Sequence, residues 1–446
     1  MPMRLMQSEK ERTLKKKVFI TQACDAGNKG DQGILKSQIA LIRKLFPNSE
    51  IYVATWWSKE LLKRVEPEIR VFSPLVDFKV REKEVPLILY PQTLVITFFL
   101  SLVSALSVKF NIRPIYRGDY LIALNDVDVV ISSGHQPFVE GSMYGPRTIF
   151  SMVANDMVLL WGALDVFIAK KIFSKRFATF PQSVGPFFTL VGRFFARFIF
   201  GNLDAVCVRE DISKTTLTQL NIKTPIYSLN DMAFFFEPTD QRQVALRRPI
   251  VGVSPCYVDG MTKEEKAHYV SVLVETLQKV HEKYGANILF LPSQTTKGKS
   301  MSVFGNEDDL EVSRTIQKSM ITRFGKVDGA QILFTESVDM FANAISQLDM
   351  LIATRMHPTI FAAGSAVPFV EIIYEHKQIG LLKTLSLLEV GINVNDISFE
   401  KLFEKSDLVW NHRIEIRNCL KEKVAFLRSR NLPVLENLVR SLVTAD

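Results

Sequence analysis

The sequence predicts an α/β protein with two doubly wound domains that face each other across a cleft. Short apolar runs alternate with longer segments of helical periodicity through most of the chain, which is the pattern of parallel sheets covered by helices. The chain has 446 residues, whereas a single hydrophobic core stops growing near ~250–300 residues. A polar segment at 237–249 carries prolines near both ends, as linkers often do. We therefore predict an N-terminal domain at 1–240 and a C-terminal domain, with C-terminal helices, at 241–446.

The first strand is predicted at 17–23, and it leads through a Gly-rich turn into a helix at 34–45. A strand, a Gly-rich turn and a helix together bring backbone N–H groups to a ligand. Asn28, Gly30 and Asp31 lie in this turn, and we predict that they bind substrate. The turn contains neither G-K-[ST] nor G-x-G-x-x-G, so it is not a P-loop or a dinucleotide fingerprint.

Further strands are predicted in the N-terminal half at 51–55, 128–134, 176–180, 205–208 and 227–229. The strand at 176–180 leads into a small-residue turn between two prolines, with Gln182, Ser183 and Gly185 inside it. Such a turn is typical of backbone that is held open beside a ligand. Arg209 follows the end of the next strand.

The C-terminal half repeats the alternation, with strands at 250–254, 287–291 and 331–334. Thr262 and Glu265 form a capping-box pattern that opens a long helix ending at Tyr284. Ser254 ends the first of these strands and Gln294 follows the second, and both are predicted to bind substrate. Two further helical segments are predicted at 340–347 and 402–443, the latter with a break near 431–433.

The segment 348–377 carries the strongest functional signal. A strand at 350–354 precedes Arg355 and His357, Pro358 starts a short helix, and a strand at 369–374 ends before Lys377. In a right-handed strand–helix–strand unit the two strands are parallel, and their carboxyl ends meet at the edge where ligands bind. Any one of these side chains alone is commonly just a solvated or hydrogen-bonded polar residue. Their joint position beside a helix N-terminus predicts an anion site that contains a proton donor.

Two apolar runs leave two interpretations open. The run at 93–108 contains no charged residue, and the run at 187–200 is rich in phenylalanine with Arg193 and Arg197 one helical turn apart. The first run is shorter than the ~20 residues that a membrane span needs. Both runs therefore form either buried helices or a monotopic face that rests on the inner leaflet.

The net charge of +8 and the pI near 9.1 suit an anionic partner, which is a phosphorylated metabolite, a lipid surface or a nucleic acid. The basic residues are dispersed along the chain, which argues against nucleic acid. Four scattered cysteines and the absence of a signal core after the charged N-terminus predict a cytoplasmic protein. The six histidines show no metal-ligand spacing, so we expect no tightly bound metal.

Five motifs in order resemble the polysaccharide pyruvyl transferase family over roughly residues 17–400. They are Asn28-x-Gly30-Asp31, Gln182-Ser183-Val184-Gly185-Pro186, Val208-Arg209-Glu210-x-x-Ser213, Arg355-x-His357 with Phe361-Ala362 and Gly364, and Tyr374-x-x-Lys377. The chain departs from the family pattern at 132–136, where a Gly-rich triplet is usual, and at Met232, where proline is common. Both departures leave the acceptor sugar open.

The resemblance implies a GT-B-like arrangement of two Rossmann-type domains and phosphoenolpyruvate as donor, without a cofactor. The product would be a pyruvate ketal on a sugar of a cell-surface or secreted glycan. The resemblance also implies that Arg209, Arg355, His357 and Lys377 match positions for donor binding and catalysis. We expect His357 to be the general acid, because a nearby phosphate favours its protonated form. His135 and His376 are the alternative proton donors.

The apolar runs and their neighbouring basic residues further suggest a lipid-linked acceptor and peripheral contact with the inner leaflet. Two other functions remain open at this point. One is a glycosyltransferase that uses a nucleotide sugar on the same two-domain plan, and the other is a non-catalytic anion or nucleic-acid binder.

Overall fold

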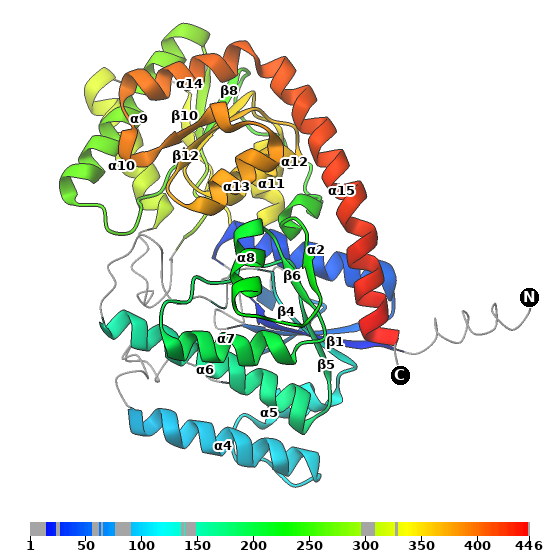
Figure 1. Ribbon diagram of the computed structural model, residues 1–446. Coiled ribbons are helices and arrows are strands. Elements are labelled where there is room, and N and C mark those ends of the chain that lie inside the picture. The colour runs from blue at the N-terminus through cyan, green and yellow to red at the C-terminus, as the bar shows by residue number, and fades with distance from the viewer. Residues whose placement is uncertain are drawn as a thin grey trace, which may run out of the picture.

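The computed structural model describes residues 15–23, 27–55, 62–63, 66–75, 91–134, 138, 149–295, 308–325 and 329–444. Figure 1 shows two α/β halves stacked one above the other, with a long C-terminal helix running along one side of both. Each half is built around one parallel sheet with helices against its faces. The predicted fold class is confirmed.

The sheet of the N-terminal half has the order β3-β2-β1-β4-β5. Its strands are β1 (Lys17–Ala23), β2 (Glu50–Thr55), β3 (Arg70–Phe72), β4 (Val129–Ser132) and β5 (Arg176–Thr179). A parallel pair, β6 (Val206–Val208) and β7 (Ile226–Ser228), continues beyond β5. Isolated parallel bridges from Ala178 to Ala205 and from Gln182 to Val208 connect this pair to β5.

The sheet of the C-terminal half has the order β10-β9-β8-β11-β12-β13. Its strands are β8 (Ile250–Ser254), β9 (Asn287–Phe290), β10 (Ala330–Ile332), β11 (Met350–Ala353), β12 (Phe369–Ile373) and β13 (Gly391–Asn393). All of its strand pairs are parallel. In both sheets the chain winds outward first to one side of the starting strand and then to the other, which is the doubly wound topology.

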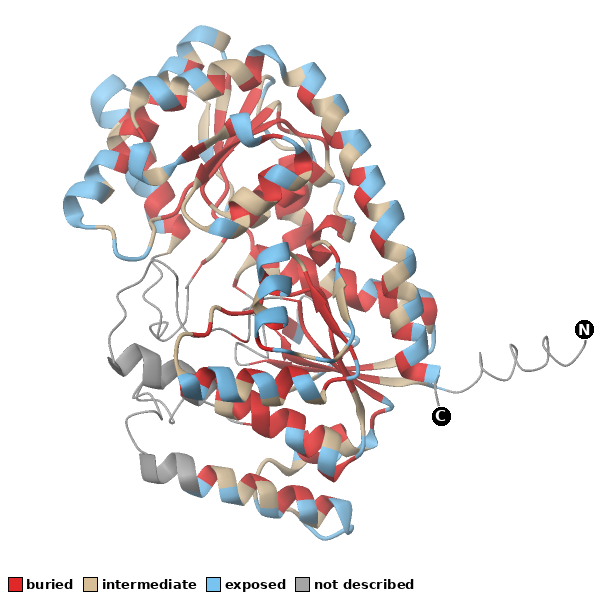
Figure 2. Ribbon diagram, viewed as in Figure 1, coloured by how far each residue is buried: buried red, intermediate tan, exposed pale blue. Residues whose placement is uncertain are grey.

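The sheets are buried on both faces because crossover helices cover them. Figure 2 shows the central strands of both halves as buried, and Val18, Val253 and Leu351 are fully inaccessible. The helices of the N-terminal half are α2 (Lys29–Leu45), α4 (Pro91–Lys109), α5 (Gly118–Asp126), α6 (Ile149–Phe167), α7 (Leu190–Asn202) and α8 (Asp211–Gln219). Those of the C-terminal half are α9 (Lys263–Tyr284), α10 (Asp309–Phe324), α11 (Val338–Ser346), α12 (Met356–Gly364), α13 (His376–Leu385), α14 (Phe399–Asn411) and α15 (Arg413–Thr444).

The capping box of α9 is confirmed. The Thr262 hydroxyl accepts a hydrogen bond from the Glu265 N–H at 3.1 Å, and the Glu265 carboxylate accepts one from the Thr262 N–H at 2.7 Å. Gly285 then ends the helix in the left-handed conformation, which glycine adopts at little cost. Local sequence therefore determines both ends of this helix.

The predicted helix break near residue 433 is wrong. Helix α15 is continuous through Pro433, and the chain instead changes direction at His412, between α14 and α15. Tertiary contacts offset the hydrogen bond that proline removes: Asn431 is buried and its side chain donates to Asn230. Further along, Glu436 pairs with Lys44 of α2 at 2.7 Å, so α15 binds the C-terminal half to the N-terminal one (Figure 1).

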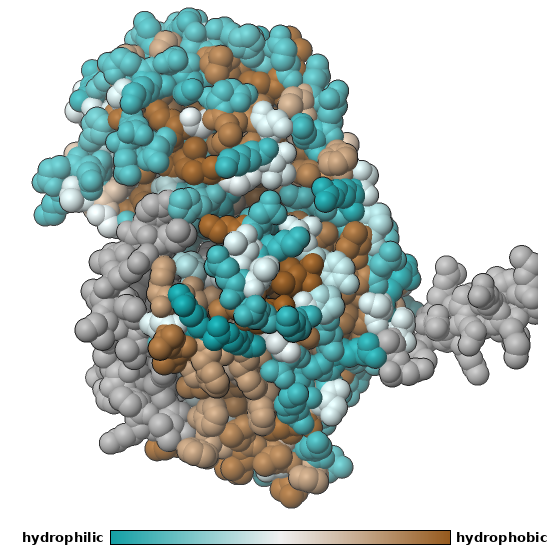
Figure 3. All heavy atoms as spheres, viewed as in Figure 1, coloured by the Kyte–Doolittle hydropathy of each residue, from teal (hydrophilic) through white to brown (hydrophobic). Residues whose placement is uncertain are grey.

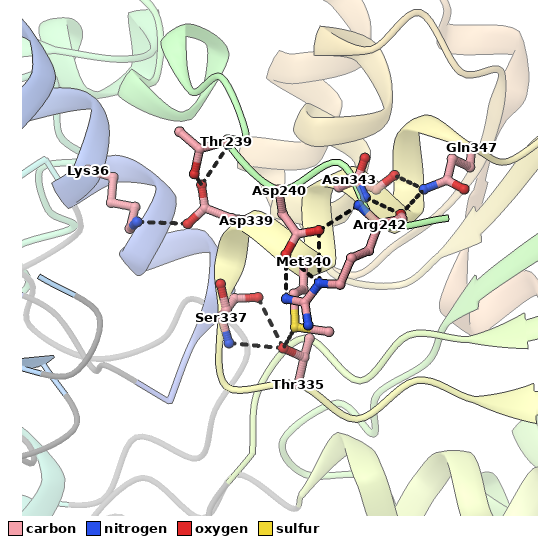
Figure 4. A network of polar contacts seen from close by, with 10 residues as sticks. All are labelled: Lys36, Thr239, Asp240, Arg242, Thr335, Ser337, Asp339, Met340, Asn343 and Gln347. Carbon is pink, nitrogen blue, oxygen red and sulfur yellow. Dashed lines mark hydrogen bonds and ion pairs between the residues drawn. The ribbon is translucent and has the colours of Figure 1, made fainter. Parts of the chain in front are cut away.

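A second connection between the halves lies between α2 and α11. Figure 4 shows Lys36 of α2 pointing to Asp339 of α11, with Thr239 of the connecting segment on the other side of the same carboxylate. The Lys36 Nζ lies 2.7 Å from Asp339 Oδ2, and Thr239 donates to Oδ1 through its N–H and its hydroxyl, both at 3.0 Å. These hydrogen bonds lower the pKa of Asp339 despite its partial burial. The carboxylate is therefore ionised and holds both halves and the connecting segment together.

The apolar runs form helices α4 and α7, but neither is a buried core helix. Phe99 of α4 is 61% exposed and Phe194 of α7 is 63% exposed. Among the described helices, none is long and apolar enough to cross a membrane.

Candidate functional site

The candidate site lies where three helix N-termini meet. Helices α12 and α13 begin just after the carboxyl ends of β11 and β12, and α2 begins after β1 in the other half. The first turn of a helix carries unpaired N–H groups and a partial positive charge. The site therefore lies at the sheet edge that the sequence predicts, between the two halves.

His357 is at the centre of this site. Helix α12 begins at Met356 rather than at Pro358, so His357 lies inside its first turn and not in the preceding loop. Its side chain is 15% exposed, and its Nε2 atom is 3.8 Å from Asp231 Oδ2. That Nε2 atom is buried and has no hydrogen-bond partner among the described residues.

The predicted catalytic residues surround this imidazole. Burial lowers the pKa of His357 to about 4, Asp231 opposes the shift, and Arg209, Lys377 and Arg355 lower the pKa further. All three cations are thus close enough to influence His357 electrostatically. At neutral pH the ligand-free protein holds a neutral imidazole here, because desolvation outweighs the single nearby carboxylate. The expectation of a protonated His357 concerns the site with phosphate bound and stays a prediction.

Arg355 forms a two-pronged ion pair with Asp309. Its Nε is 2.8 Å from Oδ2 and its Nη2 is 2.9 Å from Oδ1. Asp309 is fully buried at the start of α10 and also accepts the Gln294 N–H at 2.8 Å. Burial raises the pKa of Asp309, and Arg355 opposes that rise. Sequence analysis missed Asp309, whose only local signal is its place in the acidic start of a helix.

Arg209 reaches the site from the other half. Its Nη1 lies 2.6 Å from Asp231 Oδ2 and its Nε donates to the Ser183 hydroxyl at 2.7 Å. Both Arg209 and Asp231 have side chains that are 5% exposed. Asp231 thus stands between a cation of the N-terminal half and the imidazole of the C-terminal half. Sequence analysis did not assign Asp231 a role.

The predicted Gly-rich loop is the first turn of α2. The helix begins at Lys29, five residues earlier than predicted, because the Asn28 side chain caps it by accepting from the N–H groups of Gly30 at 2.9 Å and Asp31 at 3.4 Å. Gly30 packs directly on His357: a Cβ atom on Gly30 would lie 2.1 Å from the imidazole Cγ and Nδ1. Asp31 is near enough to raise the pKa of Arg209.

Lys29 is a further residue that sequence analysis missed. It is a fully buried lysine whose N–H donates to the Ser293 carbonyl at 2.9 Å, and Asn28 forms an antiparallel bridge with Gln294. A buried lysine at the start of a helix has no distinctive sequence pattern. Together these contacts tie the N-terminus of α2 to the C-terminal half beside the site.

The remaining predicted residues divide into two groups. Ser183 contacts Arg209 directly, and the Gln182 carbonyl accepts the Arg209 N–H at 3.1 Å. Gly185 has φ of 74° and precedes a cis proline, so it shapes the turn behind Arg209. Ser254 is different, because its buried hydroxyl donates to the Leu291 carbonyl at 2.9 Å and so joins the ends of β8 and β9.

Lys377 lies in the first turn of α13, where its Nζ is 2.5 Å from Glu375 Oε2. Behind it, the buried carboxyl of Glu371 contacts the Thr359 hydroxyl of α12 and the Gln378 amide of α13. Burial raises the pKa of Glu371 to about 8, so it is mostly protonated at neutral pH. This neutral network fixes the two helices that carry His357 and Lys377.

Each cation of the site is therefore paired with a carboxylate: Arg209 with Asp231, Arg355 with Asp309 and Lys377 with Glu375. A small polyanion would bind by replacing some of these carboxylates as the partner of the cations. The Nε2 atom of the neutral His357 could then exchange a proton with it. The described residues contain no group of three or more His, Cys, Asp or Glu side chains that could hold a metal ion. His135 lies outside the described residues.

Comparison with known proteins identifies a family. The family described as polysaccharide pyruvyl transferase matches residues 28–376. The amylovoran biosynthesis protein AmsJ of Erwinia amylovora is 21% identical over 347 residues, which cover 74% of this chain and 76% of that protein.

Solved structures share the fold at low identity. A putative UDP-N-acetylglucosamine 2-epimerase from Listeria monocytogenes has a TM-score of 0.56 at 11% identity, with 96% of each chain covered. A glycosyltransferase from Rickettsia africae has a TM-score of 0.54 at 13% identity, covering 97% of this chain and 100% of the other. The GT-B-like arrangement of two Rossmann-like domains is thereby confirmed.

The depressed pKa of His357 makes stability depend on pH. In the unfolded chain the imidazole gains a proton near pH 6.5, whereas in the folded protein it does so only near 4. The contribution of His357 to the free energy of unfolding is therefore fully present above about pH 6.5. It falls by about 3 kcal/mol as the pH is lowered to about 4. In His357→Gln, the free energy of unfolding measured with urea should fall by about 2 kcal/mol less between pH 7 and pH 4.5 than in the wild type.

His412→Gln is the matched control, since it replaces an imidazole that is 59% exposed and should keep the wild-type pH dependence. Equal pH dependence in His357→Gln and the wild type would show that His357 is not desolvated.

The contact between Gly30 and His357 leaves no room for a methyl group. Gly30→Ala should destabilise the protein by about 1–3 kcal/mol, and His357→Ala in the same chain should recover much of that loss. A double-mutant cycle by urea unfolding measures the coupling. Gly380→Ala in α13 is the control, because a Cβ there meets nothing within 4 Å and alanine favours a helix. Simple additivity of Gly30→Ala and His357→Ala would rule out the contact.

Proposed function

The chain belongs to the polysaccharide pyruvyl transferase family, and from this premise we propose that it transfers a pyruvyl group from phosphoenolpyruvate to a lipid-linked glycan. The family and the similarity to AmsJ support a transferase of polysaccharide synthesis whose acceptor is a glycan. The donor, the lipid and the residue roles are our proposals.

The observation that carries the proposal is the convergence of Arg209, Arg355 and Lys377 on His357. Phosphoenolpyruvate carries a phosphate and a carboxylate on neighbouring positions, and three cations from two domains match such a compact polyanion. Arginine holds either group through two parallel hydrogen bonds, and lysine adds a point charge. Arg209 comes from the N-terminal domain and the others from the C-terminal domain, so closure of the domains completes the site.

The reaction that we propose begins with a proton added to the methylene carbon of the donor. Positive charge develops at the neighbouring carbon, where a sugar hydroxyl adds. The bond from that carbon to the phosphate oxygen then breaks, and a second hydroxyl of the same sugar closes the ketal. The two hydroxyls lose two protons in this reaction. One returns to the group that protonated the methylene carbon, and the other leaves with inorganic phosphate.

His357 is well placed to deliver the first proton, although it is neutral without ligand. A bound donor brings negative charge against the imidazole, which raises its pKa toward the neutral range. Donor binding thus sets the charge of His357: the imidazole is neutral in the empty site and protonated when the donor is bound. After giving up its proton, its Nε2 is ready to take one from the attacking hydroxyl.

We further propose that the acceptor sugar is carried on a lipid and that the enzyme works at the cytoplasmic face of the membrane. We assign the acceptor to the N-terminal domain and the donor site to the C-terminal domain. The support for a lipid carrier is the exposure of apolar side chains on α4 and α7 of the N-terminal domain. We propose no role for nucleic acid.

Release of inorganic phosphate from phosphoenolpyruvate in the presence of glycan acceptor tests the function. We expect turnover by the wild type, and a loss of about 10²–10⁴-fold in His357→Gln with donor affinity largely kept. Arg209→Ala and Lys377→Ala should also weaken donor binding, since each removes a charge from a bound anion. Arg355→Lys should also lose activity although it keeps the positive charge, because lysine cannot form the two-pronged pair.

Arg323→Ala is the control for removing an arginine, as Arg323 pairs with Glu275 in an exposed ion pair away from the site. A nucleotide released from a nucleotide sugar, with no phosphate from phosphoenolpyruvate, would establish the glycosyltransferase alternative. A folded His357→Gln variant with wild-type turnover would remove His357 from the mechanism and leave His376 or His135 as the proton donor.

We propose that the cations of the site, rather than a metal ion, neutralise the donor. Turnover should therefore persist in EDTA, measured by the same phosphate assay after dialysis against the chelator. Loss of activity that Mg²⁺ or Mn²⁺ restores would contradict this proposal and favour the nucleotide-sugar reaction.

A further inference from the structure

Helix α4 has its apolar residues on the outside. Ile96, Phe99, Val103 and Leu106 recur every three or four residues, so they share one face, and each is between 46% and 61% exposed. The opposite face is buried, and several of its residues are small or carry a hydroxyl, among them Ser101, Ser104 and Ala105. A surface helix of a protein that meets only water has the reverse arrangement.

The buried hydroxyls show that this orientation is built into the domain. The Ser101 hydroxyl donates to the Thr97 carbonyl at 2.7 Å, and the Ser104 hydroxyl accepts the Tyr116 N–H at 2.9 Å. Phe98 packs against Trp161 of α6, with ring centroids 6.4 Å apart. The inner face is therefore satisfied by its own domain, and the outer face is left for a partner.

The exposed apolar residues are concentrated at one end of the molecule. Of the nineteen large hydrophobic residues that are exposed in the described chain, twelve lie between residues 96 and 194. They are Ile96, Phe99, Val103, Leu106, Phe110, Ile112, Ile115, Ile122, Phe167, Leu190, Val191 and Phe194. Figure 3 shows hydrophobic atoms over the lower end of the molecule, where Figure 1 places α4 and the helices above it. Scattered apolar residues need no explanation, but a concentration of this kind marks an interaction surface.

The charged residues in the segments that carry α4 and α7 are basic. From residue 85 to 118 the chain has no aspartate or glutamate, and its only charges are Lys109, Arg113 and Arg117. From residue 166 to 203 there is again no acidic residue, while Arg193 and Arg197 lie on α7. Both arginines of α7 are exposed. Apolar side chains of α4 and α7 beside mostly basic ones match the acyl chains and headgroups of an anionic bilayer, with the exposed Asp119 of α5 as an acidic neighbour of Ile122.

We propose that the outer face of α4, together with the first turns of α7, rests on the surface of an anionic lipid bilayer. The helices would lie in the plane of the interface, with their apolar side chains among the acyl chains and their basic side chains at the headgroups. A second copy of the chain is the other possible occupant. Symmetric pairing through this face would bring the same basic residues toward one another, which favours the bilayer. The inference does not depend on the identity of the donor.

Sedimentation with vesicles tests the proposal with the full-length protein. We expect the wild type to sediment with vesicles of mixed anionic and zwitterionic phospholipid, and at least about ten-fold less with purely zwitterionic vesicles or in high salt. Phe99→Glu combined with Leu106→Glu should abolish sedimentation because it places charge in the acyl region. Lys109→Glu combined with Arg113→Glu should reduce binding at low salt only.

Phe426→Glu is the matched control, since Phe426 is equally exposed but lies on α15, away from the surface, and should bind as the wild type does. Phosphate release with a water-soluble glycan fragment and no vesicles should be unchanged in all of these variants, which separates membrane binding from catalysis and confirms folding. Wild-type protein that stays in the supernatant at low salt would overturn the proposal. A dimer in solution that Phe99→Glu with Leu106→Glu converts to a monomer would assign the surface to a second copy instead.

Discussion

Burial of charge at the contact between the two domains is the constraint on which the site depends. Arg209 and Asp231 are almost inaccessible to water, and Arg355 is paired with the fully buried Asp309. A buried ion pair gains little net stability, but removing one partner costs about 3–5 kcal/mol because the other charge stays uncompensated. The carboxylates are therefore as necessary as the cations in the ligand-free protein. The carboxylates hold the cations in position and balance their charge until a bound anion takes the place of some of these carboxylates.

The same constraint explains how the domains are held. Asp231 lies 2.6 Å from Arg209 and 3.8 Å from His357, so it connects a cation of the N-terminal domain with the neutral imidazole of the C-terminal domain. Around it, Gly30 contacts the imidazole, Lys36 pairs with Asp339, and α15 runs back along the N-terminal domain. These contacts surround the site, so any movement that admits a substrate also changes the environment of His357. Opening exposes the imidazole to water, and closing on an anion surrounds it with negative charge. In both states its pKa lies above that of the empty, closed site.

Sequence analysis predicted the strands and the site edge well because both depend on local pattern. The boundaries of β1 and β8 are as predicted, and Arg209, Arg355, His357 and Lys377 do converge. Errors arose where a distant contact outweighs a local signal. Pro433 lies inside a helix because Asn431 and its neighbours are packed against another element. Asp231, Asp309 and Glu371 were missed because a single acidic residue becomes significant only through the partner that the fold brings to it. Sequence analysis could not decide whether the apolar runs are buried or exposed. Periodicity shows that a helix has an apolar face but does not show whether that face points into the protein or out of it.

The distribution of polar and apolar surface suggests how two chemically different substrates meet. The small, highly charged donor that we propose would reach the site from water, where the paired cations would bind it. A lipid-carried sugar, as we propose, would stay within a short distance of the bilayer, so the enzyme would have to approach the membrane with the domain to which we assign the acceptor. The apolar surface is on the N-terminal domain, whereas three of the four residues around the proposed donor position belong to the C-terminal domain. In the proposed function the N-terminal domain would stay at the interface while the C-terminal domain moved against it, so that closure would bring the donor to the sugar without drawing the lipid from the bilayer.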